Sequence, residues 1–234
     1  MKSRADIPAL LSLAIGGLLT TAAFLMAFFY APVQMYEDLF HWDVTFQIFY
    51  FHVPVAESSF LVFTFAMFFA IRYLMTRDRK HDTRSRLGME LTLIFVILTM
   101  ITGDLWTKAR WNVWWQWEPR LTTYFIMTLL VVGYFVLRGS VEDEERRATF
   151  SAVFAIFAWI DAPVSFIITR VMQDASSHPI VFENGGLAET PAALVTFIVA
   201  QIGMLCLAFA IYRMRMREEH LKERLEAAKI ALGG

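Results

Sequence analysis

Six long apolar runs constrain this chain more than any other feature. A bilayer core of about 30 Å requires about 20 mostly apolar residues in a helix. Each run is continuously apolar rather than alternating, which favours helices over the strands of a membrane barrel. The runs lie at about 9–31, 48–72, 88–107, 121–138, 148–170 and 190–212. The sequence therefore predicts an all-α integral membrane protein with six transmembrane helices.

The composition agrees with this prediction. Hydrophobic residues make up 57% and charged residues 18% of the 234 residues, against about 45–50% apolar and about 25% charged in soluble domains. A formal net charge of −1 excludes the electrostatic attraction on which nucleic-acid binding depends. The single cysteine excludes an internal disulfide. Neither a CxxCH haem-attachment motif nor a GxxxxGK(S/T) nucleotide motif occurs, and no other catalytic motif is present, so we expect neither an ATPase nor another enzyme.

Basic residues are distributed unevenly between the connections. Seventeen of the 21 lysines and arginines lie in the N-terminal segment, the second and fourth connections and the C-terminal tail. Because cytoplasmic loops carry the excess of basic residues, we expect both termini in the cytoplasm. The connections near 32–47, 106–120 and 171–189 then face the outer side of the membrane. The simplest division is one transmembrane domain, 1–212, followed by a cytoplasmic helical tail, 213–234.

The connection between the third and fourth spans concentrates the tryptophans. Five of the seven in the chain lie there, namely Trp106, Trp111, Trp114, Trp115 and Trp117. An aromatic belt places Trp at membrane interfaces, but a belt is spread over all helix ends, and no other connection has more than one Trp. A platform of indoles fits a large flat amphipathic ligand better. The apolar face of the ligand would stack on the rings, and its anionic groups would meet Arg110 or Arg120.

Three histidines lie on the same expected outer face, namely His41, His52 and His178. His52 opens the second span in FYFHVPVAE, where Pro54 suits a first helical turn, and His178 lies in the loop DASSHPIV. Two histidines flanking the tryptophans predict a pair of metal ligands, and imidazole is a good axial ligand for haem iron. His41 is the weaker candidate, because its neighbours are typical of an ordinary interface loop.

Two acidic residues, Glu57 and Asp161, lie inside predicted spans. A carboxylate at bilayer depth costs at least ~2.5 kcal/mol on insertion scales, so such residues usually face the bundle interior and a partner. Glu57 either orients a ligand or pairs with Arg170 or another cation. Asp161, followed by Pro163, either caps or kinks the fifth span. The sequence leaves these alternatives open.

The C-terminal tail carries a narrow apolar stripe on a charged helix. Its apolar positions, at i, i+4, i+7 and i+11, are Leu221, Leu225, Ala228 and Leu232. Such a helix lies on the membrane or on the protein itself, or docks onto a cytoplasmic ATPase subunit. His81 and His220, in basic cytoplasmic segments, are expected to be solvated.

The segment WNVWWQWEPRLT resembles the tryptophan-rich signature of the WWD family of haem-handling proteins. Over roughly residues 30–212 the layout is similar to the cytochrome c maturation protein C family, with six spans, a histidine in FHVP before span two and another in the last outer loop. The resemblance implies that His52 and His178 are the axial haem ligands. It also implies that the haem-binding loop is formed by Trp111, Trp114, Trp115, Trp117, Glu118 and Arg120.

The same resemblance implies delivery of haem rather than catalysis. Similar proteins present haem b, bound transiently and without a covalent bond, to a membrane-anchored periplasmic haem chaperone. Their implied partners are an ABC-type ATPase subunit, a second membrane subunit and a small single-helix membrane subunit. The absence of a nucleotide motif agrees with an ATPase on a separate chain.

Three positions depart from the family pattern. Asn112 stands where Gly is usual, Glu118 where Asp is usual, and Pro119 where a small residue is usual. Asn tolerates the left-handed conformations that Gly also serves. Glu keeps the charge of Asp and extends it by one methylene.

A membrane b-type haem electron-transfer protein is the main alternative. It requires histidine pairs on facing helices at bilayer depth, and the predicted spans contain no histidine beyond His52. A transporter of haem or another anion would line its path with Glu57 and Asp161, whose charge suits an anionic cargo poorly. A purely structural subunit explains the spans but not the tryptophans. The sequence therefore favours haem delivery.

Overall fold

The computed structural model describes residues 6–31, 34–36, 41–43, 47–175 and 190–232. These residues contain seven α-helices and one short hairpin. The helices are α1 (Ile7–Phe29), α2 (Phe49–Thr76), α3 (Arg79–Trp111), α4 (Pro119–Ser140), α5 (Glu144–Trp159), α6 (Asp161–Val171) and α7 (Pro191–Ala231). A 3-10 turn, η2 (Gln173–Ala175), follows α6. Six segments are long and apolar enough to cross a membrane, with α5 and α6 sharing the fifth. The predicted six-span all-α fold is confirmed.

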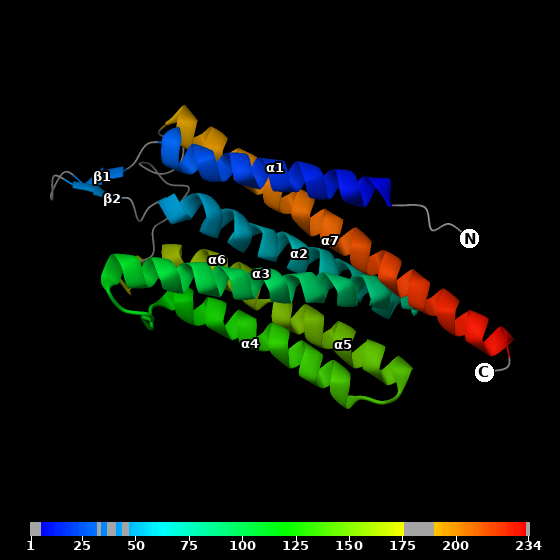
Figure 1. Ribbon diagram of the computed structural model, residues 1–234. Helices are drawn as coiled ribbons and strands as arrows, with labels where there is room; N and C mark the ends of the chain where they lie inside the picture. Colours follow the sequence, from blue (N-terminus) through cyan, green and yellow to red (C-terminus); the bar gives the residue numbers. More distant parts are fainter. Residues whose placement is uncertain (1–5, 32–33, 37–40, 44–46, 176–189, 233–234) are drawn as a thin grey trace.

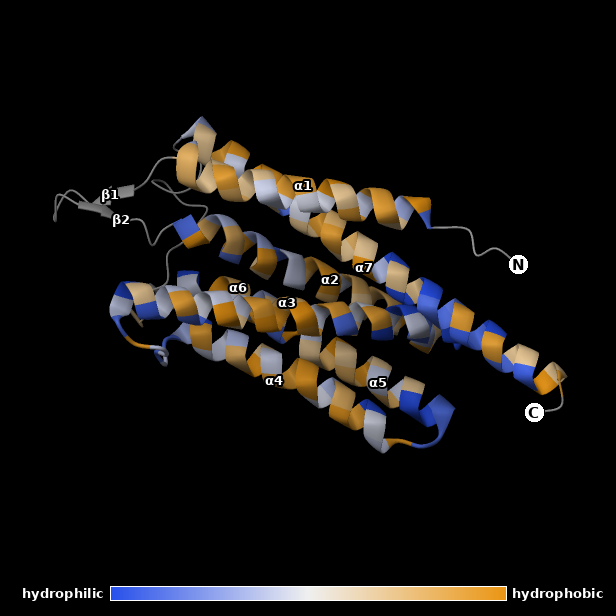
Figure 2. Cartoon of the chain, in the orientation of Figure 1, coloured by the Kyte–Doolittle hydropathy of each residue, from blue (hydrophilic) through white to orange (hydrophobic). Residues whose placement is uncertain are grey.

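The two ends of the bundle differ in what they carry (Figure 1). The start of α1 and the end of α7 lie at one end, whereas the α3–α4 connection lies at the opposite end. That opposite end also carries the hairpin of β1 (Gln34–Tyr36) and β2 (His41–Asp43), two antiparallel strands that the sequence did not predict. Hydrophobic residues dominate the middle of the helices, and polar residues gather toward the ends (Figure 2).

Two helices extend well beyond the predicted spans. α3 begins at Arg79 rather than near residue 88, because Asp78 caps it by accepting a hydrogen bond from the Lys80 backbone N–H at 3.0 Å. α7 continues through residue 212 as far as Ala231 without a break. The predicted tail is thus the continuation of the sixth span, and its apolar residues Leu221 and Leu225 are exposed.

The fifth span is interrupted at one point. α5 ends at Trp159 and α6 begins at Asp161, so the helix breaks at Ile160, where the sequence offered a kink as one alternative. Pro163 has no N–H for the Trp159 carbonyl, which removes one helical hydrogen bond at the break. Asp161 does not cap α6, and its buried Oδ2 has no hydrogen-bond partner among the residues that the structure describes.

Small residues bring two pairs of helices into close contact. A Cβ atom on Gly16 of α1 would lie 2.9 Å from the backbone nitrogen of Leu207 in α7. On α3, a Cβ on Gly88 would lie 2.8 Å from the Cβ of Ala66 in α2. Such contacts are typical of membrane helices, which associate through van der Waals packing rather than a hydrophobic driving force.

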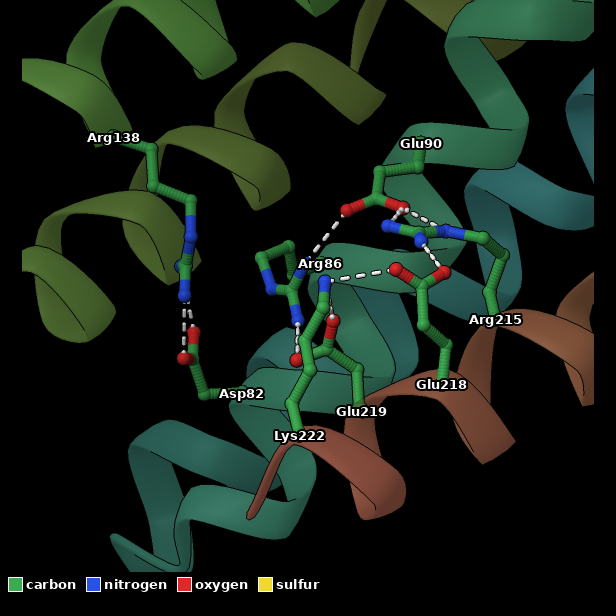
Figure 3. A network of polar contacts seen from close by, with 8 residues as sticks. All are labelled: Asp82, Arg86, Glu90, Arg138, Arg215, Glu218, Glu219 and Lys222. Atoms are coloured by element: carbon green, nitrogen blue, oxygen red, sulfur yellow. Dashed lines mark hydrogen bonds and ion pairs between the residues drawn. The ribbon is translucent and has the colours of Figure 1, made fainter. Parts of the chain in front are cut away.

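Ion pairs fasten the extension of α7 to α3 (Figure 3). The Glu90 carboxylate accepts hydrogen bonds from Arg86 at 2.7 Å and from Arg215 Nη2 at 2.8 Å. Arg86 also contacts Glu219 at 2.7 Å. One carboxylate of α3 is therefore shared by an arginine of its own helix and an arginine of α7.

His81 contradicts the expectation of a solvated side chain. It lies in the first turn of α3, is buried, and stacks on Phe69 of α2 with ring centroids 5.7 Å apart and an interplanar angle of 22°. The reason is the early start of α3, which places this residue against the end of α2. His220 is exposed, as predicted.

Candidate functional site

A small cavity of about 40 Å³ lies at the end of the bundle that carries the α3–α4 connection. Helices α2, α3 and α4 and the connection itself contribute to its wall. The wall includes His52, Gly103, Asp104, Trp106, Trp115 and Arg120. The structure thus brings together one predicted ligand histidine, two of the five clustered tryptophans and one of the two candidate arginines.

The hydrogen bonds of Thr102 fix the tautomer of His52. Thr102 Oγ1 lies 2.8 Å from the carbonyl oxygen of Leu98 and 3.2 Å from that of Thr99, and both oxygens only accept. The single hydroxyl proton of Thr102 therefore points to a carbonyl. His52 Nδ1, 2.9 Å from Thr102 Oγ1, must then be the donor of their hydrogen bond. We therefore assign the proton to Nδ1, which leaves on Nε2 the lone pair that a metal ligand needs.

Gly103 makes space for the His52 ring. A Cβ atom on Gly103 would lie 3.1 Å from His52 Cε1, which is tighter than an ordinary van der Waals contact. Thr102 and Gly103 are consecutive residues of α3, so one helical turn both orients the imidazole and accommodates it. The sequence analysis missed both residues, because their roles depend on the packing of α2 against α3.

α2 begins close to the predicted start of the second span, near residue 48, but Pro54 lies deeper in the helix than predicted. The helix begins at Phe49, so His52 is its fourth residue and Pro54 lies in the second turn rather than the first. Glu57 has no ion pair with any residue that the structure describes. Arg170 instead donates to the Phe166 carbonyl at 3.3 Å. Pairing of Glu57 with Arg170, one of the alternatives that the sequence left open, is therefore not observed.

The tryptophans do not form a flat platform. Trp106 and Trp111 meet edge to face with centroids 4.9 Å apart, and Trp115 and Trp117 do so at 5.4 Å. Trp114 is 60% and Trp117 75% exposed. These two rings present apolar surface outward, whereas Trp115 lines the cavity.

Trp115 carries a buried polar atom with an unused donor. Its indole Nε1 has no hydrogen-bond partner among the described residues. Buried Trp N–H groups usually find one. This donor lies on a side chain that lines the cavity beside His52, so it is available to an anionic group of a ligand there.

Asn112 ends α3 in the left-handed conformation, with φ 58°. Its backbone oxygen and Oδ1 accept hydrogen bonds from Lys108 Nζ at 3.0 and 2.9 Å. The same ammonium lies 5.9 Å from the Trp114 ring centroid. Asn112 thus adopts the left-handed conformation that Gly also adopts readily, as the sequence indicated.

Glu118 acts as the N-cap of α4. It is 6% exposed, and its Oε1 accepts a hydrogen bond from the Leu121 backbone N–H at 2.6 Å. Pro119 occupies the first helical position, where its missing N–H costs nothing. In the sequence, the Glu–Pro pair before an apolar run could have indicated this helix start, but Glu is not among the preferred N-cap residues. The capping contact gives Glu118 a structural function in the connection.

The two candidate arginines occupy different places. Arg120 lines the cavity and donates through Nη1 to the Ser165 carbonyl at 3.0 Å, which ties α4 to α6. Arg110 lies in the last turn of α3, is partly buried and does not line the cavity. His178 lies outside the described residues, so its predicted role stays a prediction.

The chain matches known proteins over most of its length. The family model described as Heme exporter protein C covers residues 3–231. The Heme exporter protein C of Bradyrhizobium diazoefficiens is 25% identical over 193 residues, which span 82% of this chain and 73% of that protein. The proteins of the same name from Rhodobacter capsulatus and Haemophilus influenzae are each 24% identical, over 201 and 179 residues. These matches span 83% and 76% of this chain and 81% and 73% of the two relatives. The chain belongs to the Heme exporter protein C family.

Proposed function

We propose that this protein binds haem b at the end of the bundle formed by His52 and the tryptophan connection, and delivers it to a membrane-anchored haem chaperone. The process served is the biogenesis of c-type cytochromes, which agrees with membership of a haem exporter family. The observation that carries the proposal is the His52–Thr102 hydrogen bond, which leaves Nε2 with its lone pair. His178 is proposed as the second axial ligand.

The size of the cavity supports a superficial site. About 40 Å³ is far below the roughly 300–1,000 Å³ of pockets that enclose small molecules, so the cavity does not enclose a porphyrin. We propose that the ring lies on the exposed indoles Trp114 and Trp117, and that Trp111 belongs to the same haem-binding loop. A cargo held by replaceable Fe–N bonds and one apolar face is easily passed to an acceptor.

Two donors beside His52 suit the carboxylates of haem. The Trp115 indole N–H is buried without a partner in the described structure. The Arg120 guanidinium has five N–H donors, and its hydrogen bonds to Ser165 and Phe166 both run through Nη1. We assign propionate contacts to Trp115 and Arg120, and a peripheral electrostatic role to Arg110.

The proposed orientation places the haem end in the periplasm and both termini in the cytoplasm, in the bacterial inner membrane. It is supported by the excess of basic residues at the opposite end. The proposed partners are an ABC-type ATPase subunit, a second membrane subunit and a small single-helix subunit. The cytoplasmic tail, 213–234, is the proposed contact for the ATPase.

Haem transfer tests this proposal. The protein is co-purified with the acceptor chaperone, and the haem spectrum of each component is recorded with and without ATP. The expected result is haem on this protein before transfer and on the acceptor after it. Reversible reduction by quinol with no transfer would instead indicate an electron carrier and overturn the proposal.

Replacing Thr102 with Val is expected to weaken haem binding by about 10–100-fold, the usual effect of removing an outer-shell partner of a ligand histidine. Val removes the acceptor of the Nδ1 proton and nearly preserves the side-chain shape. Thr102→Ser keeps the hydroxyl and is the matched control. The measurement is a titration of the purified protein with haem, followed by its Soret absorbance. Equal affinities for Val and Ser would contradict the prediction.

Replacing Gly103 with Val is expected to displace the His52 ring, because even a Cβ atom would lie 3.1 Å from Cε1. We expect weaker haem binding in the same titration. The matched control is Gly17→Val on α1, because no atom lies within 4 Å of the position of a Cβ there. The prediction is wrong if both variants bind haem as the wild type does.

A further inference from the structure

A second cavity, of about 360 Å³, lies between the first turns of α3 and the extension of α7, at the end of the bundle opposite His52. Its wall is rich in basic side chains, and Glu223 is the only carboxylate among the described residues that line it. The basic residues are Arg79, Lys80, Arg84, Arg213 and His220. Four permanent cations and a histidine therefore face one acid.

The acids that pair with these cations mostly lie outside the wall. Arg79 pairs with Glu144, Lys80 contacts Asp78 at 2.6 Å, and Arg213 contacts Asp6 at 3.0 Å. Arg84 differs, because no ion pair joins it to any acid in the described part of the chain. Its guanidinium instead lies 5.2 Å from the centroid of the Phe69 ring.

The backbone adds to the positive charge. The N-terminus of α3 carries the positive end of the helix dipole, where anions are favourable and cations are not. Asp78 caps this end and Asp82 lies in its first turn, but Arg79 and Lys80 occupy the same turn, and Arg84 follows in the second. An anionic ligand in the cavity would compensate the dipole and the side chains together.

An apolar groove of about 210 Å³ continues from this cavity toward the middle of the bundle. Its lining comes from α2, α3 and α7 and is apolar except for the tyrosine at its end. It includes Leu61, Phe65, Leu91, Leu205, Phe209 and Tyr212. Tyr212 lines both the groove and the basic cavity, and it meets Phe65 edge to face at 5.0 Å.

We propose that this face binds one anionic phospholipid, with the phosphate in the basic cavity and an acyl chain along the groove. Basic pockets between membrane helices suit anionic head groups. A soluble phosphate or nucleotide would occupy the cavity but not the groove. A zwitterionic lipid is less favourable than an anionic one, because the wall offers its cationic group a single carboxylate, Glu223, among several cations. A lipid bound here touches both α3 and α7 and holds the extension of α7 against the bundle.

Native mass spectrometry of the delipidated full-length protein in detergent tests the proposal, with phosphatidylglycerol and phosphatidylcholine as probes. We expect one phosphatidylglycerol per chain, bound more tightly than phosphatidylcholine. Arg84→Gln should weaken phosphatidylglycerol binding roughly fivefold, the effect of one cation at a membrane surface. Arg84→Lys keeps the charge and should retain binding. Arg224→Gln, exposed on the same α7 and outside the wall, should bind as the wild type does.

The groove is tested separately from the charge. Leu205 is 37% exposed and lines the groove, so Leu205→Trp fills it without changing any ion pair. We expect this variant to lose phosphatidylglycerol as strongly as Arg84→Gln does. Equal binding of the two lipids, or wild-type binding by both variants, would overturn the proposal. Displacement by inorganic phosphate with no effect of Leu205→Trp would show a site for free anions, and would overturn it too.

Discussion

Replacing His52 with Gly is expected to lower haem affinity by more than the roughly 100-fold that an outer-shell change produces, because it removes a ligand of the iron itself. The Soret band that haem acquires on binding should disappear at concentrations that saturate the wild type. Added imidazole should restore it, since the deleted ring leaves a space beside Thr102 and Gly103. The measurement is the same titration with haem, with and without imidazole.

His220→Gly is the matched control, because His220 is exposed and lies at the opposite end of the bundle. Its Soret band should match that of the wild type. If His52→Gly keeps the full band without imidazole, another residue holds the iron and the proposed ligand is wrong.

Replacing Asp82 with Ala is expected to destabilise the protein by about 1.5–3 kcal/mol, the usual contribution of hydrogen bonds between charged groups, because it leaves a partly buried arginine without its partner. Asp82 accepts two hydrogen bonds from Arg138, at 2.8 and 2.7 Å, and so joins α3 to α4 (Figure 3). The two side chains are only 15% and 13% exposed. Thermal unfolding in detergent measures the loss.

Two controls separate this effect from a general loss of charge. The double variant Asp82→Leu with Arg138→Met removes both charges and should be less destabilised than Asp82→Ala. Glu226→Ala breaks the exposed pair with Lys229, which is worth at most about 1 kcal/mol. Equal unfolding temperatures for Asp82→Ala and Glu226→Ala would contradict the prediction.

The spans were predictable because they depend on local composition. Each apolar run is long enough to cross a bilayer, and α1 and α4 lie close to their predicted bounds. The ends of α3 and α7 were not predictable from hydropathy, because caps and ion pairs determine them. Asp78 extends α3, and contacts between Arg215 and Glu90 hold the continuation of α7.

The candidate site was predictable in its most unusual residues only. His52 and the tryptophans stand out in the sequence, and Asn112 adopts the left-handed conformation that its position indicated. Thr102 and Gly103 have no such signal, since threonine and glycine are common in membrane helices. Their function arises from the packing of α2 on α3. The edge-to-face arrangement of the indoles likewise depends on how the connection folds between two helices.

Pulsed electron paramagnetic resonance of the ferric haem complex identifies the ligand of the iron directly. The sample is a variant in which His52 is the only histidine, labelled with ¹⁵N in its imidazole and loaded with excess haem. Because this variant lacks His178, the proposed second ligand, we expect high-spin ferric iron with a ¹⁵N coupling from the coordinated Nε2 of His52, in addition to the ¹⁴N couplings of the pyrrole nitrogens. A spectrum with pyrrole ¹⁴N couplings alone would contradict the assignment of His52 as a haem ligand.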